Sequence, residues 1–325
     1  MLAAVCRSNG PPEVVRVGDA PVPEPGRGEV QVQVTAASVN FPDVLLVAGE
    51  YQIKVPPPFV PGSEFVGTVS ALGDSVEGYR VGDRVSATAI TGAFAEFAAV
   101  PVRSLRPIPA TIDDATAAAF GVAYRTAFHS LKSLARVQPD EEVLVLGGSG
   151  GVGLGAVELA TVMGARVTAV GSSPERLAVA ASRGAVRVVD RTQGDLRETL
   201  KAMLPSGFDV VIDPVGGRLA VPALRSLAWG GRYITIGYAS GKIPEVPLNL
   251  VLLKGAHLMG FEFRGFVEHN ALEAERNDSE LFDLLARDRI HPHIGATFAL
   301  RDAAAALRYV ADGKAVGKVI VEVGG

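Results

Sequence analysis

Six residues between positions 148 and 153 have the spacing of a phosphate-binding loop. The segment Gly148-Ser-Gly-Gly-Val-Gly153 follows an apolar run, Glu142 to Leu146, and overlaps the start of a run of small and apolar residues, Val152 to Met163. Glycines permit a tight turn and close approach of a pyrophosphate, and a helix N-terminus offers unpaired N–H groups. A strand before the loop and a helix after it predict a dinucleotide site. The residues predicted to contact the cofactor here are Gly148, Ser149, Gly150, Gly151, Val152 and Gly153.

The end of the next predicted strand indicates which dinucleotide binds. An NAD site places Asp or Glu there to bind the ribose hydroxyls, whereas this chain has Gly171. Ser172 and Ser173 instead offer hydroxyls at a helix start, Arg176 follows one turn later, and Arg191 can add a second charge. This neutral-to-positive pocket suits a 2′-phosphate and predicts NADPH. In the alternative interpretation the serines only cap the helix and the arginines face solvent.

Strands and helices alternate around this loop. Short apolar strands that alternate with helices predict a parallel sheet covered on both faces. The predicted strands are Glu142 to Leu146, Arg166 to Val170, Val186 to Val189, Phe208 to Ile212 and Arg232 to Ile236. The predicted helices are Val152 to Met163, Pro174 to Ser182, Leu196 to Leu204 and Leu219 to Leu227.

The two ends of the chain have a different texture. The first third, to about Ala118, is proline-rich and contains period-2 segments such as Val30 to Val34, which predict an irregular β domain. A polar helix is expected at about Glu268 to Asp288. A final helix, Ala303 to Val310, and a strand, Lys318 to Val323, follow. A length of 325 residues agrees with two domains.

Composition excludes several function classes. Hydrophobic residues make up 48% and charged residues 20%, which is ordinary for a globular protein with a sizeable core, and the net charge of -4 argues against nucleic-acid binding. Every apolar run is interrupted well before about 18 residues, so no membrane span is expected. The N-terminus has no secretory signal, and the single cysteine, Cys6, cannot form an internal disulfide. We therefore expect a reducing, cytoplasmic compartment.

Several motifs together resemble one enzyme family along nearly the whole chain. They are Ala36-Ala-Ser-Val-Asn-Phe-Pro-Asp43, Pro61-Gly-Ser-Glu-Phe-Val-Gly67, Val81-Gly-Asp-Arg-Val85, Gly92-Ala-Phe-Ala-Glu96, the glycine loop and Asp213-Pro-Val-Gly216. The chain resembles the medium-chain dehydrogenase/reductase superfamily, in its zinc-free, zeta-crystallin-like NADPH:quinone oxidoreductase branch. The resemblance implies an α/β protein: a β-rich, GroES-like catalytic domain (1–118 and 265–325), a doubly wound Rossmann domain (119–264), and a cleft for the nicotinamide.

Zinc relatives in this superfamily carry a cysteine and a Gly-His-Glu motif where this chain has Asn40 and Gly62-Ser63-Glu64. Without soft ligands no Lewis acid is expected to polarise an alcohol or carbonyl. His291-Pro-His293 offers two imidazoles, but a third ligand is not nearby in the sequence. No metal is therefore predicted.

The resemblance also assigns roles to individual residues. It places Asn40 against the nicotinamide and substrate, and Tyr51 in the acceptor pocket, as proton donor or binding residue. Asn40 can instead cap the turn before Pro42, and Tyr51 can instead pack in a proline-rich loop. Leu45 stands where relatives often have a second tyrosine, and Asp190 where they often have a tyrosine near the 2′-phosphate. The further cofactor contacts that it implies are Thr126, Gly237, Tyr238, Phe261, Phe263 and Lys318.

These observations predict a zinc-independent oxidoreductase that transfers hydride from NADPH to a quinone or related conjugated carbonyl, such as an enone. One alternative is a 2-enoyl thioester reductase, which needs a proton donor and room for an acyl carrier. Another is a non-catalytic NADPH-binding protein, structural or RNA-binding, which the acidic balance disfavours. By resemblance we expect a homodimer or higher oligomer, formed through a sheet edge near Tyr233 to Ile236.

Overall fold

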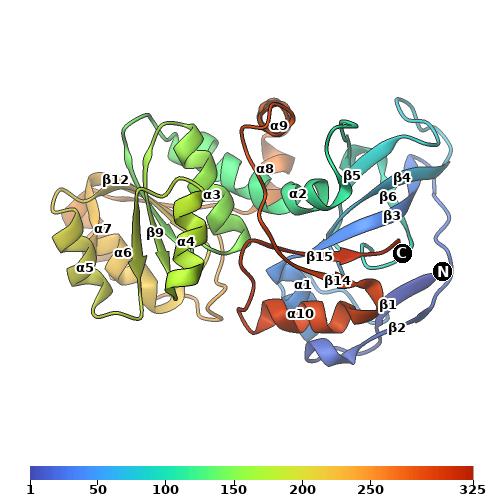
Figure 1. The fold of residues 1–325 in the computed structure, drawn as a ribbon, viewed down its shortest axis with the longest axis horizontal. Helices are drawn as coiled ribbons and strands as arrows, with labels where there is room; N and C mark the ends of the chain where they lie inside the picture. The colour runs from blue at the N-terminus through green and yellow to red at the C-terminus, as the bar shows by residue number, and fades with distance from the viewer. Residues whose placement is uncertain (325) are drawn as a thin grey trace. The chain divides into compact units, whose positions relative to one another are not determined.

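The computed structural model describes residues 1–324 and contains two compact units. A parallel sheet forms the centre of one unit (Figure 1). The strands lie in the order β10-β9-β8-β11-β12-β13, and all neighbouring pairs are parallel. This order confirms the predicted doubly wound α/β architecture. The strands are β8 (Glu142–Leu146), β9 (Arg166–Gly171), β10 (Arg187–Asp190), β11 (Phe208–Asp213), β12 (Leu227–Thr235) and β13 (His257–Gly260).

Helices connect these strands, and side-chain caps fix where two of them begin. Ser173 accepts a hydrogen bond from the Arg176 N–H and so starts α4 at Pro174, and Asp195 caps α5 in the same way. The helix expected at about Glu268 to Asp288 is α9, and a further short helix that the sequence did not predict, α8, precedes it and ends before Asn270. The helices are α3 (Gly151–Val162), α4 (Pro174–Ser182), α5 (Leu196–Met203), α6 (Ala220–Arg225), α7 (Leu248–Lys254), α8 (Phe263–His269) and α9 (Ala271–Ala286).

The other unit is built on a mainly antiparallel sheet with a valine-rich core. Long strand β3 (Glu29–Val39) pairs with three neighbours, and alternate residues of its first half are buried, as the period-2 pattern predicts. The further strands are β1 (Leu2–Cys6), β2 (Val15–Asp19), β4 (Glu64–Leu72), β5 (Arg84–Thr88), β6 (Phe97–Pro101), β7 (Leu105–Pro107), β14 (Ile294–Ala299) and β15 (Lys318–Glu322). The helices are α1 (Phe41–Ala48) and α10 (Ala303–Ala311).

The chain divides between the two units at two points. Met1–Val122 and the stretch from Pro292 form the β-rich unit, and Ala123–His291 forms the parallel-sheet unit. The first division lies inside α2 (Asp114–His129), which continues as a π-helical segment, Ser130–Ala135. The resemblance implies breaks near 118 and 264. In the structure, residues 265–291 group instead with the parallel sheet.

Candidate cofactor and acceptor site

The glycine loop joins β8 to α3 with a geometry that requires glycine. A Cβ on Gly153 would lie 2.1 Å from the Gly147 carbonyl oxygen, and one on Gly148 would lie 2.8 Å from the Ala169 Cβ. Gly150, the N-cap of α3, would meet only the Gly147 oxygen, at 3.5 Å. Two glycines therefore allow close packing of strand, loop and helix, while Gly150 leaves a bare backbone at the helix start. These residues fit a bound pyrophosphate.

The carboxyl end of β9 has a glycine where an NAD site would place an acidic side chain. A Cβ on Gly171 would lie 2.7 Å from Leu177 Cδ2, so the end of that flexible, buried side chain would have to shift. Ser172, Ser173 and Arg176 follow at the start of α4, and all three are partly buried. The backbone N–H of Arg191 donates to the Gly171 carbonyl at 3.0 Å, which holds this second arginine beside the same turn.

Asp190 places a carboxylate at the end of the neighbouring strand β10. Its Oδ1 accepts hydrogen bonds from the Thr192 hydroxyl at 2.7 Å and the Thr192 N–H at 2.9 Å. These bonds lower the pKa of Asp190. The carboxylate is thus ionised and engaged by Thr192, while two arginines adjoin the same turn.

The carboxyl end of the sheet also positions the residues predicted to contact the nicotinamide half. Gly237 and Tyr238 follow β12, and the Phe261 N–H donates to the Thr235 carbonyl directly after β13. Beneath them, the Tyr233 hydroxyl donates to Asp213 Oδ2 at 2.5 Å, and Asp213 Oδ1 accepts the N–H groups of Val215 and Gly216. Because the carboxyl ends of parallel strands lie on the same side of a sheet, the predicted cofactor residues after β8, β9, β10, β12 and β13 all lie on that side.

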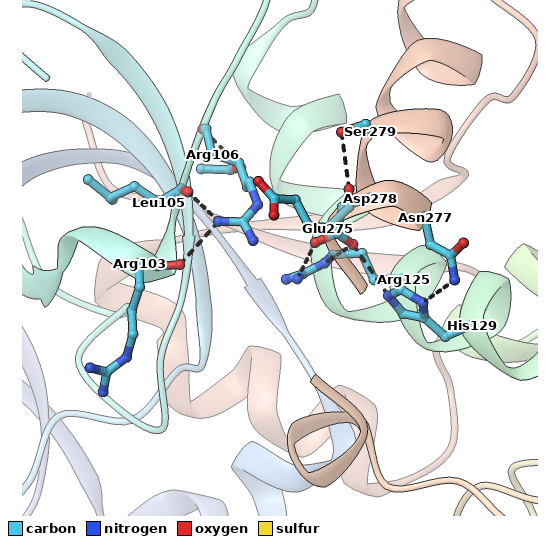
Figure 2. Close-up of polar contacts among 10 residues, drawn as sticks. Arg103, Leu105, Arg106, Arg125, His129, Glu275, Asn277, Asp278 and Ser279 are labelled. Carbon is cyan, nitrogen blue, oxygen red and sulfur yellow. Dashed lines mark hydrogen bonds and ion pairs between the residues drawn. The ribbon is translucent and has the colours of Figure 1, made fainter. Parts of the chain in front are cut away.

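A buried polar cluster lies between α2, the π-helical segment and α9 (Figure 2). Arg125 donates two hydrogen bonds to Asp278, at 2.8 and 2.7 Å. The fully buried His129 has Nε2 3.3 Å from Asp278 Oδ1 and Nδ1 3.2 Å from Asn277 Nδ2. Burial would raise the pKa of Asp278, but His129 and Arg125 outweigh it and lower that pKa to about 2.

This cluster supports the aromatic segment after β13. The His129 ring lies 4.9 Å from the Phe266 ring and 6.1 Å from the Phe263 ring, centroid to centroid, and Arg125 lies 4.7 Å over the Phe263 ring. Sequence reasoning assigned no role to His129 and did not identify Arg125, Asn277 or Asp278. The one available signal was the four-residue spacing of Arg125 and His129, which places both on one helix face. Thr126 lies buried on the same helix.

The β-rich unit holds a second buried cluster, which contains two predicted site residues. Lys318 Nζ lies 2.5 Å from Asn40 Oδ1 and 3.3 Å from Glu64 Oε2. Asn40 Nδ2 donates to Glu64 Oε2 at 3.0 Å and approaches Ser63 Oγ at 3.4 Å. The resemblance implies that Asn40 faces the nicotinamide and substrate and that Lys318 contacts the cofactor. The structure brings these two side chains into direct contact.

Asp43 lies beneath this cluster with no exposed surface. Its Oδ2 accepts the Asn40 N–H at 2.7 Å, which fixes the start of α1. Burial raises the pKa of Asp43 to about 7, against the lowering effects of the Asn40 N–H, the nearby Ser63 hydroxyl and the Lys318 charge. The sequence predicts no role for Asp43 beyond its place in the motif that ends at this residue.

Tyr51 lies in the turn after α1. Gly49 ends the helix in a left-handed conformation, and the Tyr51 N–H then donates to the Leu45 carbonyl at 3.2 Å. Its ring is partly buried against the core of the β-rich unit. This placement agrees with a packing role as well as with a role toward an acceptor.

Within residues 1–324, no group of three or more His, Cys, Asp or Glu side chains is placed to hold a metal ion. His291 pairs with Asp288 at 3.1 Å, and its Nδ1 lies 3.6 Å from Glu158.

No helix in the described part of the chain is both long and apolar enough to cross a membrane.

The two units match two family models. Residues 26–110 match the alcohol dehydrogenase GroES-like domain, and residues 151–276 match the family described as zinc-binding dehydrogenase. A GroES-like unit combined with a doubly wound sheet and a glycine loop defines a medium-chain dehydrogenase/reductase.

Similar sequences and structures show which group within this superfamily the chain belongs to. It is 38% identical over 322 residues to quinone oxidoreductase-like protein 2 of Mus musculus, which covers 98% of this chain and 91% of that protein. Escherichia coli quinone oxidoreductase complexed with NADPH matches with a TM-score of 0.92 and 26% identity, over 99% of this chain and all of that chain. A mycobacterial structure complexed with NADPH matches with a TM-score of 0.92 and 32% identity, over the same shares. The chain belongs to the quinone oxidoreductase-like proteins of this superfamily.

Proposed function

We propose that the protein is an NADPH-dependent reductase of quinones or related conjugated carbonyls. The observation that carries the proposal is the glycine cradle of β8 and α3 beside a β9 turn that has arginines and no acid. The two similar structures complexed with NADPH support the same cofactor. When bound, NADPH supplies the hydride. The protein binds it, orients it and excludes water.

Each part of the cofactor has candidate partners in the parallel-sheet unit. The loop residues Gly148 to Gly153 would hold the pyrophosphate through backbone N–H groups. Arg176 and Arg191, with the hydroxyls of Ser172 and Ser173, would bind the 2′-phosphate by charge-assisted hydrogen bonds. The residues proposed to surround the nicotinamide half are Thr126, Gly237, Tyr238, Phe261 and Phe263. Lys318, a further predicted cofactor contact, lies in the β-rich unit, where Asn40 and Glu64 engage its ammonium.

We also propose that the reaction needs no zinc. The resemblance places zinc ligands of relatives at Asn40 and Ser63, which offer an amide and a hydroxyl instead of a thiolate and an imidazole. The ammonium of Lys318 lies 2.5 Å from Asn40 Oδ1. A divalent cation at that position would be repelled by the ammonium, and the neighbouring Glu64 carboxylate is already engaged by Lys318 and Asn40, so this donor set does not suit zinc.

A 2-enoyl thioester reductase is the second candidate for the same site. The chain is 32% identical over 304 residues to a stretch of a mycocerosic acid synthase-like polyketide synthase of Mycobacterium tuberculosis, which covers 92% of this chain and 14% of that protein. Tyr51 would then supply the proton that follows hydride transfer. Non-catalytic binding of NADPH, in a structural or RNA-binding protein, would leave every acceptor unreduced.

We propose that two or more copies associate through the edge strand β13. The edge strand was predicted near Tyr233 to Ile236, in β12. In the structure β13 pairs with β12, so β13 is the edge strand of the sheet. Exposed apolar side chains lie on β12, on β13 and on α7, which contacts β12, and an open strand edge beside apolar side chains favours pairing with a second copy. They are Trp229, Leu248, Leu252, Leu253 and Leu258.

Turnover of an acceptor panel tests the main proposal. Purified protein is mixed with NADPH and, separately, with quinones, enones and enoyl-CoA esters, and cofactor absorbance is followed before and after treatment with a chelator. We expect turnover of quinones or enones that survives the chelator. Activity confined to enoyl-CoA would favour the second candidate, and cofactor binding without any turnover would favour the non-catalytic one.

We also propose a cytoplasmic location, from the single free cysteine, Cys6. Fractionation of cells tests this location.

A further inference from the structure

Lys318 is a buried ammonium whose partners are fixed. It is the first residue of β15, its side chain is 4% exposed, and its backbone N–H donates to the His293 carbonyl at 2.8 Å. A buried ammonium requires hydrogen-bond acceptors and a counter-charge. Asn40 Oδ1 at 2.5 Å and Glu64 Oε2 at 3.3 Å supply both.

Glu64 is the counter-charge and is itself held from two sides. Its Oε1 accepts the Val122 N–H at 2.8 Å, where Gly121 leaves room because a Cβ there would lie 2.5 Å from that oxygen. Its Oε2 accepts hydrogen bonds from Asn40 and Lys318. The carboxylate therefore has a fixed position between β4, α1 and α2.

These partners determine the orientation of the Asn40 amide. An ammonium only donates and a carboxylate only accepts, so the amide oxygen must face Lys318 and the amide nitrogen must face Glu64. One amide hydrogen is then used by Glu64 at 3.0 Å, whereas the other has only Ser63 Oγ at 3.4 Å. Asn40 is 8% exposed and Ser63 is partly buried, so the second hydrogen has only a long contact, to the more exposed of the two residues that the amide nitrogen approaches.

The positive charge on the amide oxygen alters the amide nitrogen. An ammonium at a carbonyl oxygen draws electron density from the whole amide group and strengthens its N–H groups as donors. We propose that Lys318 is a positioning residue that orients and polarises the Asn40 amide, and that the second N–H of Asn40 donates to the carbonyl oxygen of the acceptor during reduction. This inference rests on the proposed reductase function and extends it to how the acceptor is activated.

The step balances without another reagent. The electrophilic carbon of the acceptor gains the hydride with its electron pair, the carbon–carbon or carbonyl π electrons move toward the oxygen, and the oxidised cofactor NADP⁺ remains. The negative charge on that oxygen is stabilised by the Asn40 N–H until a proton arrives from water or a nearby acid. A donor aimed at a developing oxyanion contributes about 10²- to 10³-fold in other enzymes.

Steady-state kinetics of Lys318→Met provide the first test, with Lys314→Met as control because Lys314 is an exposed lysine of the same region. We expect Lys318→Met to lower kcat roughly 10- to 100-fold with an enone and less with an electron-poor quinone, while the Kd for NADPH changes less than about threefold. In an Asn40→Ala background, Lys318→Met should cost almost nothing further. Unchanged kcat with a raised KM for NADPH would instead make Lys318 a cofactor contact. An equal loss with all acceptors, additive with Asn40→Ala, would make it merely structural.

Binding of an oxyanion provides a second test that does not depend on turnover. We expect 4-nitrophenolate, followed by its absorbance, to bind the complex with NADP⁺ about tenfold more weakly after Lys318→Met, with neutral nitrobenzene unaffected. Equal binding to both proteins would overturn the proposal. If Lys318→Met does not fold, Glu64→Gln/Lys318→Met removes both charges and should show the same losses. A wild-type protein that binds NADPH but reduces no acceptor would refute the proposed function, while the nitrophenolate result would still decide the role of Lys318.

Discussion

The backbone N–H of Arg191 donates to the carbonyl of Gly171 at 3.0 Å, so the second arginine adjoins the turn that begins α4. Both arginines identified from the sequence thus accompany a β9 end that has Gly171 in place of an acidic side chain. We propose that a preference for NADPH over NADH follows from this arrangement.

Arg176→Ala should weaken NADPH binding by about 1.5 to 3 kcal/mol and leave NADH nearly unchanged, because only the 2′-phosphate offers the charge-assisted bond. Isothermal titration with both cofactors measures the difference. Arg197→Ala, at an exposed arginine on α5, is the control and should alter neither affinity. Equal affinities of the wild-type protein for NADPH and NADH would refute the assignment.

Two glycines of the loop should respond differently to alanine. Gly153→Ala forces a Cβ against the Gly147 carbonyl, so both thermal stability and NADPH binding should fall. Gly150→Ala introduces no close contact within the protein, so its melting temperature should stay near that of the wild type while NADPH binding weakens. A Gly150→Ala protein with normal affinity would show that the cofactor does not approach this backbone.

Local patterns predicted the parallel-sheet unit well. The strand Glu142–Leu146 and the helix Pro174–Ser182 have the predicted bounds, because a short apolar run and a Ser-Pro cap act within a few residues. β13 was not predicted because its four residues are mostly exposed and show no apolar pattern. The edge was therefore assigned to its neighbour.

Local sequence patterns could not predict the contacts that build the two buried clusters. Lys318 and Asn40 are 278 residues apart, and Arg125 and Asp278 are 153 apart, so only the tertiary fold brings them together. The Arg125–Asp278 pair also joins α9 to the C-terminal half of α2. This pairing is one reason that residues 265–291 group with the parallel sheet, although the resemblance had placed them in the other domain.

Asp278→Asn should destabilise the protein by about 3 to 5 kcal/mol, because it leaves the Arg125 guanidinium buried without a counter-charge. The folded pKa of Asp278, about 2, lies below the unfolded value of about 3.9. Its contribution to stability is therefore complete above about pH 4 and is lost as the pH falls toward 2. Urea unfolding between pH 2.5 and 7 should show a flatter acid limb for Asp278→Asn. Asp283→Asn, at an exposed position of the same helix, should retain the wild-type profile.

Leu252→Lys should convert the proposed oligomer to a monomer. Leu252 is 80% exposed on α7, which contacts β12 beside the open edge, and a buried lysine in an apolar interface would be strongly unfavourable. Light scattering at micromolar concentration measures the change. Leu272→Lys, at a 77% exposed leucine on α9, should leave the oligomer intact. A monomeric wild-type protein would contradict the proposed association.

Tyr51→Phe separates the two enzyme candidates because it removes only a hydroxyl. A quinone accepts hydride to give a hydroquinone anion that water protonates easily, whereas an enoyl thioester leaves an enolate that gains about 10²- to 10⁴-fold from a positioned acid. If Tyr51 is that acid, turnover of enoyl-CoA should fall about a hundredfold or more with NADPH affinity unchanged. For a quinone reductase we expect a change in KM alone, as for a residue that only binds the acceptor. Tyr79→Phe, at a partly buried tyrosine of the same unit, controls for the loss of a hydroxyl elsewhere. Unchanged kinetics with every acceptor would show that Tyr51 only packs against the core.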